Sequence, residues 1–212
     1  MLRYDCAVGY ERGAGINEAA AAVKRGALVV LPTDTVYGLG CDAFNPAAVE
    51  ALLAAKRRER DMPVPVLIGS WHTLDGLVDH VPGYVHDLVR AFWPGGVTLV
   101  VRHAPSLAWD LGDAFGTVAV RMPLHPVAVE LLALTGPMAV SSANITGQLP
   151  ATTCDNAQMQ LGDDVAVYLD GGPSPEAVPS SIVDCTGTRP RLLRAGAVRA
   201  DEIRDVVPDL SD

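Results

Sequence analysis

Two polar segments with the residue types of a ligand site each follow a run of apolar residues. The first is Pro32-Thr-Asp-Thr-Val-Tyr-Gly-Leu-Gly-Cys-Asp42, and the second is Ser141-Ser-Ala-Asn-Ile-Thr-Gly147. Loops beyond the carboxyl ends of strands are where open α/β sheets bind ligands. Small hydroxyl residues with free backbone N–H groups can also hold phosphate there. A hydrogen-bonded corner of the sheet uses similar residues, so the segments alone favour binding and structural interpretations about equally.

Cations supply the second chemical signal. A helix C-terminus accounts for one or two positive charges, but not for four cations within five residues, so we predict a local phosphate site. The cluster consists of Lys56, Arg57, Arg58 and Arg60. Arg121 and Arg194 each stand at the end of an otherwise apolar segment. A lone arginine there needs an anionic partner, either a structural carboxylate or the carboxylate of a ligand.

Composition and the missing motifs exclude several classes of protein. The 212 residues include 16 Lys and Arg against 25 Asp and Glu, a net charge of −9, so an overall basic surface that coats nucleic acid is excluded. With 49% hydrophobic residues, disorder is excluded as well. The sequence lacks a Walker A loop, HExxH, GxSxG and paired metal ligands. The segment 38–43 matches GxGxxG/A only formally, because Pro46 starts a helix after it rather than within it.

The cysteines and the apolar runs bear on the compartment. Cys6, Cys41, Cys154 and Cys185 form no CxxC pair, so we expect free thiols in a reducing environment. The N-terminus lacks the apolar core of a signal peptide, and the longest apolar runs are far shorter than a bilayer crossing. We therefore predict a soluble, cytoplasmic protein without a membrane partner.

Helical and strand patterns alternate along the chain and predict one α/β domain with a twisted, mostly mixed sheet flanked by helices. Asn17 is expected to cap a helix that ends at Gly26, and Asn45 with Pro46 to open a helix through Ala55. A further short helix is expected after Ser70. Other helices are predicted over 84–92, 126–134, a segment ending at 160, and 200–206. Strands are predicted over 27–31, 64–68, 97–101, 117–120, 138–140, 165–169, 181–183 and 191–193.

Six segments in order resemble the YrdC/Sua5 family of L-threonylcarbamoyladenylate synthases. They are PTDTVYGLGCDA, AAKRR with the following DMP, WPGGVTLV, TVAVRMPLHP, SSANITG and LLRAG, and they span residues 32–196. The resemblance implies one YrdC-like domain over 1–212, with the motifs in 27–196 and a C-terminal helix at about 200–206. In length the sequence is similar to the single-domain YrdC type, without the extra C-terminal domain of longer Sua5 proteins.

The resemblance also implies a reaction. Threonine takes up bicarbonate, and the resulting carboxylate attacks the α-phosphate of ATP, so that pyrophosphate leaves. Threonylcarbamoyl-AMP then passes to a tRNA-threonylcarbamoyl transferase complex that modifies adenosine 37 of tRNAs reading ANN codons. No enzyme nucleophile is needed, and catalysis would rest on positioning and charge neutralisation. Mg²⁺ is expected to bind through the ATP phosphates rather than through a protein metal site.

Site residues follow from the resemblance by position. Lys56, Arg58 and Arg121 are the implied catalytic residues. The implied ATP-binding residues are Lys56, Arg58, Met62 (near its backbone), Thr117, Ser142, Asn144 and Arg194. The implied threonine-binding residues are Thr35, Leu67, Arg121, Val140 (through its backbone) and Ser181. The sequence departs from the family pattern at Leu67, where a histidine is common, at Ser180-Ser181, where Ser-Thr is usual, and at Arg194-Ala-Gly196, where Arg-Pro-Gly is usual.

Two other interpretations remain open on the sequence. The chain could be an RNA-binding module with weak tRNA binding through the cluster at 56–60, or a YciO-like paralogue with a different nucleotide reaction or none. An RNA binder would show a steep salt dependence of RNA affinity, whereas an enzyme acting on free ATP would not.

Overall fold

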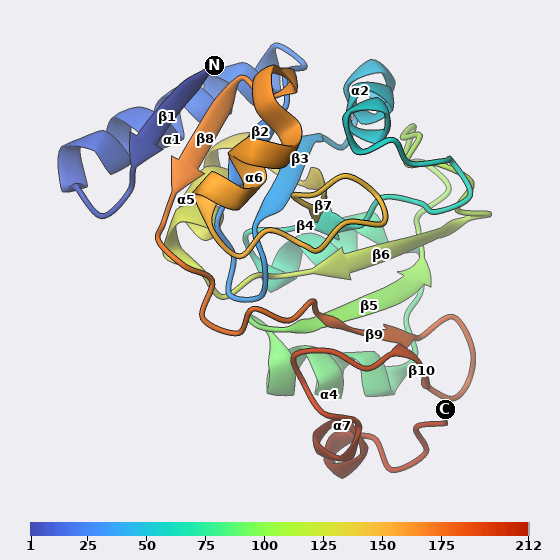
Figure 1. The fold of residues 1–212 in the computed structure, drawn as a ribbon. Helices are drawn as coiled ribbons and strands as arrows, with labels where there is room; N and C mark the ends of the chain where they lie inside the picture. The colour runs from blue at the N-terminus through green and yellow to red at the C-terminus, as the bar shows by residue number, and fades with distance from the viewer. Residues whose placement is uncertain (212) are drawn as a thin grey trace.

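Ten strands form one mixed sheet in the computed structural model, which describes residues 1–211 (Figure 1). The strands are β1 (Leu2–Asp5), β2 (Val29–Leu31), β3 (Gly38–Asp42), β4 (Val66–Leu67), β5 (Val97–Arg102), β6 (Thr117–Arg121), β7 (Met138–Ser142), β8 (Val167–Asp170), β9 (Ser181–Asp184) and β10 (Arg191–Arg194). Their order across the sheet is β1-β8-β2-β3-β7-β4-β6-β5-β9-β10. The pairs β1–β8, β2–β8, β4–β6 and β5–β9 are parallel and the rest antiparallel, which confirms the predicted mixed sheet.

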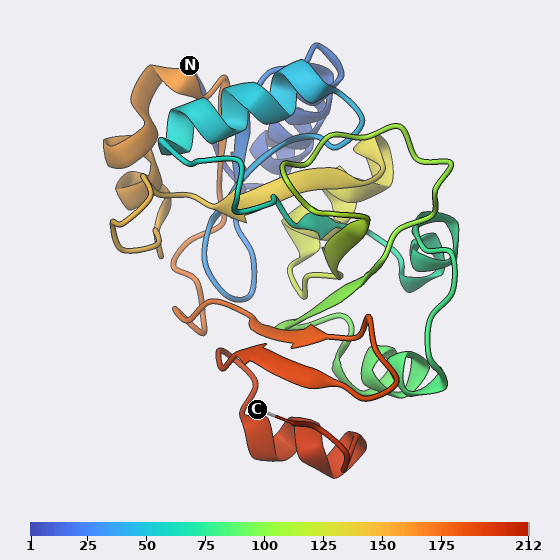
Figure 2. The ribbon, with the colours of Figure 1, turned by 90° about the vertical axis from the view of Figure 1, so that its right-hand side faces the viewer.

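Helices flank the sheet on both faces. They are α1 (Gly9–Lys24), α2 (Pro46–Lys56), α3 (Leu74–Leu77), α4 (Gly83–Phe92), α5 (Pro126–Thr135), α6 (Cys154–Leu161) and α7 (Ala200–Val206), with short 3₁₀ turns at Trp71–Thr73 and Gly162–Asp164. The views in Figures 1 and 2 place α7 below β9 and β10, and α2 at the opposite end of the molecule. The C-terminal helix predicted over 200–206 is observed with those bounds.

The two faces of the sheet are covered unequally. One core joins α2, α4, α6 and α7 to one face of the sheet from β8 to β10, through residues such as Leu39, Leu99 and Val120. On the other face, α1 and α5 pack only over the first half, against residues such as Leu31 and Val140. Successive side chains of a strand point to opposite faces. The second half of this face, over β6, β5, β9 and β10, therefore lies outside both helix-covered cores.

The N-terminal helix corrects the sequence prediction. It begins at Gly9 after Val8, and Asn17 lies inside it rather than capping it. Its glycines lower the intrinsic helix propensity, which hides the first turns from a pattern analysis. Gly15 is needed for packing, because a Cβ there would lie 2.6 Å from Tyr4 Cβ on β1. Close contact with the sheet thus outweighs the local preference. By contrast, the predicted Asn45 cap is confirmed, since its Oδ1 accepts from the Ala48 N–H at 3.2 Å.

The segment predicted as a continuous polar loop after residue 31 contains a strand that the pattern missed. Residues 38–42 pair antiparallel with both β2 and β7. Glycine normally weakens a strand, but here it allows close approach of the neighbours. A Cβ on Gly38 would lie 2.6 Å from Val140 Cγ1, and one on Gly40 would lie 2.9 Å from Met138 Cε. The polar loop is therefore confined to residues 32–37, and the sheet turns back on itself immediately after it.

Candidate active site

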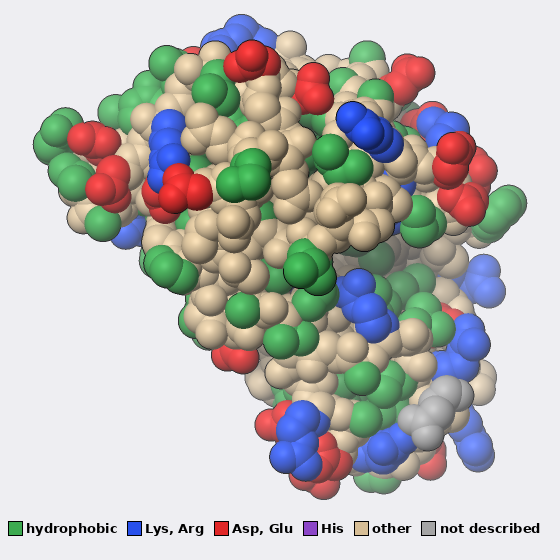
Figure 3. Space-filling view, in the orientation of Figure 1, with side chains coloured by type: hydrophobic (Ala, Val, Ile, Leu, Met, Phe, Trp, Pro, Cys, Tyr) green, Lys and Arg blue, Asp and Glu red, His purple; other side chains and the backbone are tan. Residues whose placement is uncertain are grey.

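A cavity of about 470 Å³ occupies the part of the sheet face that α1 and α5 leave open. Its floor is formed by Leu67 of β4, Thr98 of β5, Thr117 and Arg121 of β6, and Ile182 of β9. The loop after β2 and the end of β7 close one side, and β10 closes another. In the space-filling view the molecule is hollowed between its upper part and its lower part, beside a basic side chain (Figure 3).

Strand alternation sorts polar and apolar residues between the two faces. Val97, Leu99 and Val101 of β5 point into the core, while Thr98 and Val100 line the cavity. On β6, Val118 and Val120 belong to the core, and Thr117 and Arg121 line the cavity. The polar residues at alternate positions thus build the site without interrupting the core.

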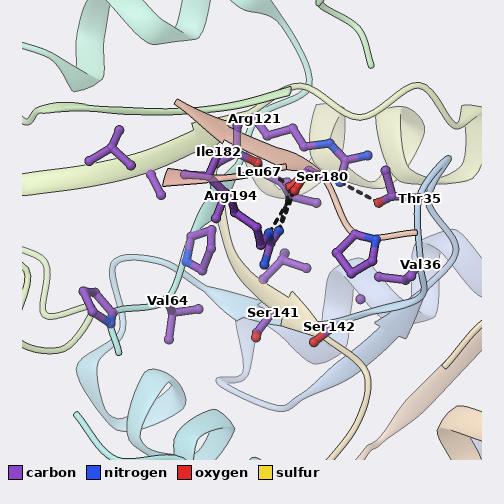
Figure 4. A pocket seen from close by; sticks show the side chains of 18 of the residues that line it. Thr35, Val36, Val64, Leu67, Arg121, Ser141, Ser142, Ser180, Ile182 and Arg194 are labelled. Atoms are coloured by element: carbon purple, nitrogen blue, oxygen red, sulfur yellow. Dashed lines mark hydrogen bonds between the residues drawn. The ribbon is translucent and has the colours of Figure 1, made fainter. Parts of the chain in front are cut away.

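One end of the cavity is built around Arg121. Its Nε donates to the Gly95 carbonyl at 2.8 Å, its Nη1 to Thr35 Oγ1 at 2.8 Å, and its Nη2 to Asp34 Oδ1 at 2.5 Å. Arg121 is 6% exposed. Burial lowers its pKa, and the Asp34 carboxylate opposes that shift. Of the two partners that the sequence left open for this arginine, the structural carboxylate is present as Asp34. Figure 4 shows the guanidinium reaching toward Thr35.

A second arginine occupies the other end. Arg194 donates from Nη2 and Nε to the Ser180 carbonyl, at 2.7 and 3.1 Å. The Ser180 hydroxyl lies 3.3 Å from Nη2 and 2.8 Å from Thr98 Oγ1. Burial lowers the pKa of Arg194. In Figure 4 its guanidinium lies across the cavity from Ser141 and Ser142.

The third cavity arginine comes from the basic cluster. Arg58 donates to the carbonyls of Met62 and Pro63 at 2.7 and 2.9 Å, and to Ser141 Oγ at 3.0 Å. Burial lowers its pKa. Its neighbour Arg57 adopts a left-handed conformation at the C-terminus of α2 and is exposed. The turn after the helix therefore directs Arg58 inward and Arg57 outward.

Lys56 lies beneath the cavity rather than in its lining. It is 2% exposed, and its Nζ donates to the carbonyls of Ser142 and Asn144, with Asn144 Oδ1 at 3.5 Å. Burial, with a smaller effect of Arg58, lowers its pKa to about 7. All three ammonium donors are thus directed at the 142–144 loop, which Lys56 ties to the end of α2.

The structure brings most, but not all, of the predicted site residues together. Those that line the cavity are Thr35, Arg58, Leu67, Thr117, Arg121, Val140, Ser142 and Arg194. Lys56, Met62, Asn144 and Ser181 do not. Asn144 is tied to the Ile145 and Gln148 carbonyls, and Met62 contributes its carbonyl to Arg58. Ser181 is fully buried, and its hydroxyl accepts from the Gly196 and Val198 N–H groups.

Sequence reasoning missed four serine and threonine residues of the lining: Thr33, Thr98, Ser141 and Ser180. Ser180 and Ser181 are adjacent, and alternation requires one of them to face the cavity and the other the interior. The alternation therefore predicts that Ser180 and Ile182 share one face of the strand and that Ser181 and Val183 share the other. It does not predict which of the two faces lines the cavity until the neighbouring strands are known.

The ionisable side chains of the lining favour anions. Apart from the Tyr37 phenol, the only ionisable groups that line the cavity within the described chain are Arg58, Arg121 and Arg194, and no carboxylate lines it. Tyr37 donates to the Gly172 carbonyl at 2.6 Å, and burial raises its pKa. Three arginines in a chain of net charge −9 create a local positive site. This lining can bind and orient anionic groups and stabilise developing negative charge.

The same residue set does not fit a protein metal site. Mg²⁺ prefers oxygen ligands, carboxylates above all, and the cavity presents cations and hydroxyls instead. Within residues 1–211, no group of three or more His, Cys, Asp or Glu side chains could hold a metal ion.

The four cysteines are free and buried, as expected for unpaired thiols. No helix of the described residues is long and apolar enough to cross a membrane.

A family model and two curated relatives match this chain over most of its length. A family model described as "Telomere recombination", that of Sua5, YciO and YrdC, matches residues 21–196. A relative from Mycobacterium tuberculosis, named "Putative threonylcarbamoyl-AMP synthase", is 60% identical over 204 residues, covering 96% of this chain and 94% of its own. The Bacillus subtilis threonylcarbamoyl-AMP synthase is 36% identical over 194 residues, covering 91% of this chain and 56% of its own.

A solved structure agrees at the level of the fold. The crystal structure of Pyrococcus abyssi Sua5 complexed with L-threonine superposes with a TM-score of 0.92 at 32% identity. The alignment covers 99% of this chain, which spans 61% of that one. The chain thus corresponds to nearly the whole mycobacterial relative and to about three fifths of the archaeal structure.

Proposed function

This chain belongs to the Sua5/YciO/YrdC family, and from that membership we propose that its arginine-lined cavity binds ATP and L-threonine side by side. The activity is threonylcarbamoyl-AMP synthesis, and the enzyme is an ATP-using nucleotidyl-type transferase that serves tRNA modification. In this proposal, Arg58 and Arg194 with Ser141, Ser142 and Thr117 hold the nucleotide. Arg121 and Thr35, with Leu67 and Val140, hold the amino acid.

The observation that carries this assignment is the placement of three arginines in a cavity without a carboxylate. The reaction joins two anions, a triphosphate and the carbamate of threonine, which repel each other in water. Guanidinium groups suit both, because they pair with phosphate and carboxylate through parallel N–H donors. Arg58 and Arg194 are held largely by backbone carbonyls, which orient them without neutralising them.

The chemistry follows from what the cavity holds. The threonine amine takes up bicarbonate with loss of water and becomes a carbamate. A carbamate oxygen then attacks the α-phosphorus of ATP, the bond to the bridging oxygen breaks, and pyrophosphate leaves. Negative charge on the phosphoryl oxygens would be met by Arg58 and Arg194, which stand ready before the reaction. The cavity supplies position and charge, and no enzyme nucleophile takes part.

Mg²⁺ enters this scheme with ATP as part of the substrate, since the lining lacks carboxylates of its own. Bicarbonate is the proposed third substrate. We further propose that the product passes to a transferase complex that modifies adenosine 37 of tRNAs reading ANN codons. A mixed anhydride of this kind reacts with water, so transfer must follow soon after synthesis.

Separate titration of the two ligands tests the two-ended site. By calorimetry, Arg121→Lys should raise the Kd of threonine roughly tenfold and leave the Kd of ATP nearly unchanged, because lysine cannot reproduce a planar bidentate grip. Arg194→Ala should raise the Kd of ATP and leave the Kd of threonine nearly unchanged. Arg102→Lys, at the exposed end of β5 outside the cavity, is the matched control and should change neither value. Equal losses of both ligands in Arg121→Lys would show that Arg121 is structural through Asp34.

A further inference from the structure

We propose that Thr33 is a positioning residue that fixes the Thr35 hydroxyl as a hydrogen-bond acceptor toward the substrate. The inference rests on the proposed function, because it concerns the threonine end of the cavity. Both side chains line the cavity, and Thr33 and Thr35 are only 2% and 1% exposed. Their hydrogen bonds must therefore be satisfied within the protein or by a ligand.

The direction of the protons follows from the partners. Thr33 Oγ1 lies 2.6 Å from the Val36 carbonyl oxygen, which can only accept, so the Thr33 proton is committed there. Thr33 Oγ1 also accepts from the Thr35 N–H at 3.2 Å. Thr35 Oγ1 lies 3.1 Å from Thr33 Oγ1, and because Thr33 has no proton left, Thr35 must be the donor in this contact.

Arg121 determines which hydrogen bonds the Thr35 hydroxyl can still form. Its Nη1 donates to Thr35 Oγ1, so Thr35 gives its single proton to Thr33 and receives one from Arg121. A hydroxyl oxygen accepts two hydrogen bonds, which leaves one lone pair of Thr35 for a ligand. Each hydrogen bond in the series Arg121, Thr35, Thr33 and Val36 carbonyl therefore has a fixed donor and a fixed acceptor.

Arg121 is left with two donors for the same ligand. A guanidinium carries five N–H groups, and three of them are used by Gly95, Thr35 and Asp34. One N–H remains on each terminal nitrogen. The subsite therefore combines two free donors with one adjacent acceptor, which matches an α-amino acid: its carboxylate accepts from Arg121, and its N–H or hydroxyl donates to Thr35. A fully ionised phosphate group offers only acceptor oxygens and is therefore disfavoured at the Thr35 oxygen, which needs a donor.

The test compares three variants by calorimetry with ATP and L-threonine. Thr33→Val keeps the shape of the side chain but removes the hydroxyl that accepts the Thr35 proton. It should raise the threonine Kd roughly tenfold and leave the ATP Kd unchanged. Thr33→Ser keeps the hydroxyl and should stay within about twofold of wild type. Thr135→Val removes a hydroxyl that bonds within α5, away from the cavity, and should change neither Kd. Thermal unfolding of each variant shows that it is folded.

The comparison of threonine with valine identifies the donor. If Thr33→Val loses preference for threonine over valine, the donor is the substrate hydroxyl; if both amino acids weaken equally, it is the N–H. Unchanged threonine affinity in Thr33→Val, equal loss of threonine and ATP, or failure of Thr33→Ser to restore affinity would each overturn the inference. Wild-type protein that binds no threonine would instead overturn the proposed function, and the inference with it.

Discussion

At the residue scale, the site uses arginines whose charges are oriented but only partly compensated. Arg58 and Arg194 donate to backbone carbonyls and serine hydroxyls, so the protein fixes their direction without a hydrogen bond to a carboxylate. Arg121 differs, because Asp34 pairs with it while two of its N–H groups remain unused. This difference suits the proposed division of ligands, since a triphosphate carries more negative charge than a single carboxylate.

Arg58→Ala tests the charge at the nucleotide end. It should remove a charge-assisted contact of about 1.5–3 kcal/mol and so lower kcat/KM by roughly one to two decades. Arg57→Ala is the matched control, because Arg57 is the next residue and points to solvent. Steady-state kinetics with ATP varied measure both. Equal losses in the two variants would mean that the cluster acts as a diffuse positive patch.

Lys56 gives stability a defined pH dependence. Burial lowers its pKa to about 7 from 10.5. Between these two values the unfolded chain holds a proton that the folded chain has released, so raising the pH favours the folded state. The free energy of unfolding of wild type minus that of Lys56→Met should therefore rise from pH 7 to 9.5 and be flat below pH 7. Urea unfolding measures it, and the exposed Lys24→Met provides the control. A flat difference throughout would show that Lys56 stays charged in the folded protein.

At the element scale, close backbone contacts hold the strands that carry the site. The turn after β10 packs directly on the residues before β9, and a Cβ on Gly196 would lie 2.3 Å from the Pro179 carbonyl oxygen and 2.6 Å from the Ser180 carbonyl carbon. Gly38 and Gly40 have the same function on β3, against Val140 and Met138 of β7. The site therefore depends on glycines that allow strands and turns to approach.

Gly196→Ala tests this dependence. The backbone at Ser180 must move, which should weaken the Arg194 anchor, raise the Kd of ATP about tenfold and lower the free energy of unfolding by about 1–3 kcal/mol. Gly187→Ala is the control, because the nearest atom to its added Cβ is 3.7 Å away and its φ is not left-handed. Calorimetry and urea unfolding provide the measurements. Wild-type ATP affinity in Gly196→Ala would contradict the proposed link between this turn and Arg194.

The sequence predicted elements best where local signals and packing agree. The α2 cap at Asn45 and the alternating strands β5 and β6 were predicted within a residue. It placed the start of α1 too late and missed β3, because glycines that weaken local propensity are required by tertiary contacts at Gly15 and Gly38. For the site, the motifs located eight lining residues. Burial alone distinguishes Lys56 beneath the 142–144 loop from Arg58 in the cavity, since the two lie in one basic run.

At the scale of the whole molecule, the fold produces a basic cavity in an acidic protein. One face of the sheet packs against helices from β8 to β10, and the other does so only over its first half, so the open half becomes the site. The net charge of −9 disfavours non-specific binding to RNA. Three arginines instead line the cavity where ATP and the carboxylate of threonine must meet. This arrangement supports a synthase of free ATP and threonine over an RNA-binding module.

The most direct test of this account is the substrate dependence of pyrophosphate release. In a coupled assay with purified protein and Mg²⁺, release should require ATP, threonine and bicarbonate together, because the attacking carboxylate exists only after threonine has captured bicarbonate. Leaving out threonine, or removing carbon dioxide, should each abolish the signal. Pyrophosphate released from ATP alone, at a rate unaffected by threonine or by carbon dioxide removal, would contradict the account.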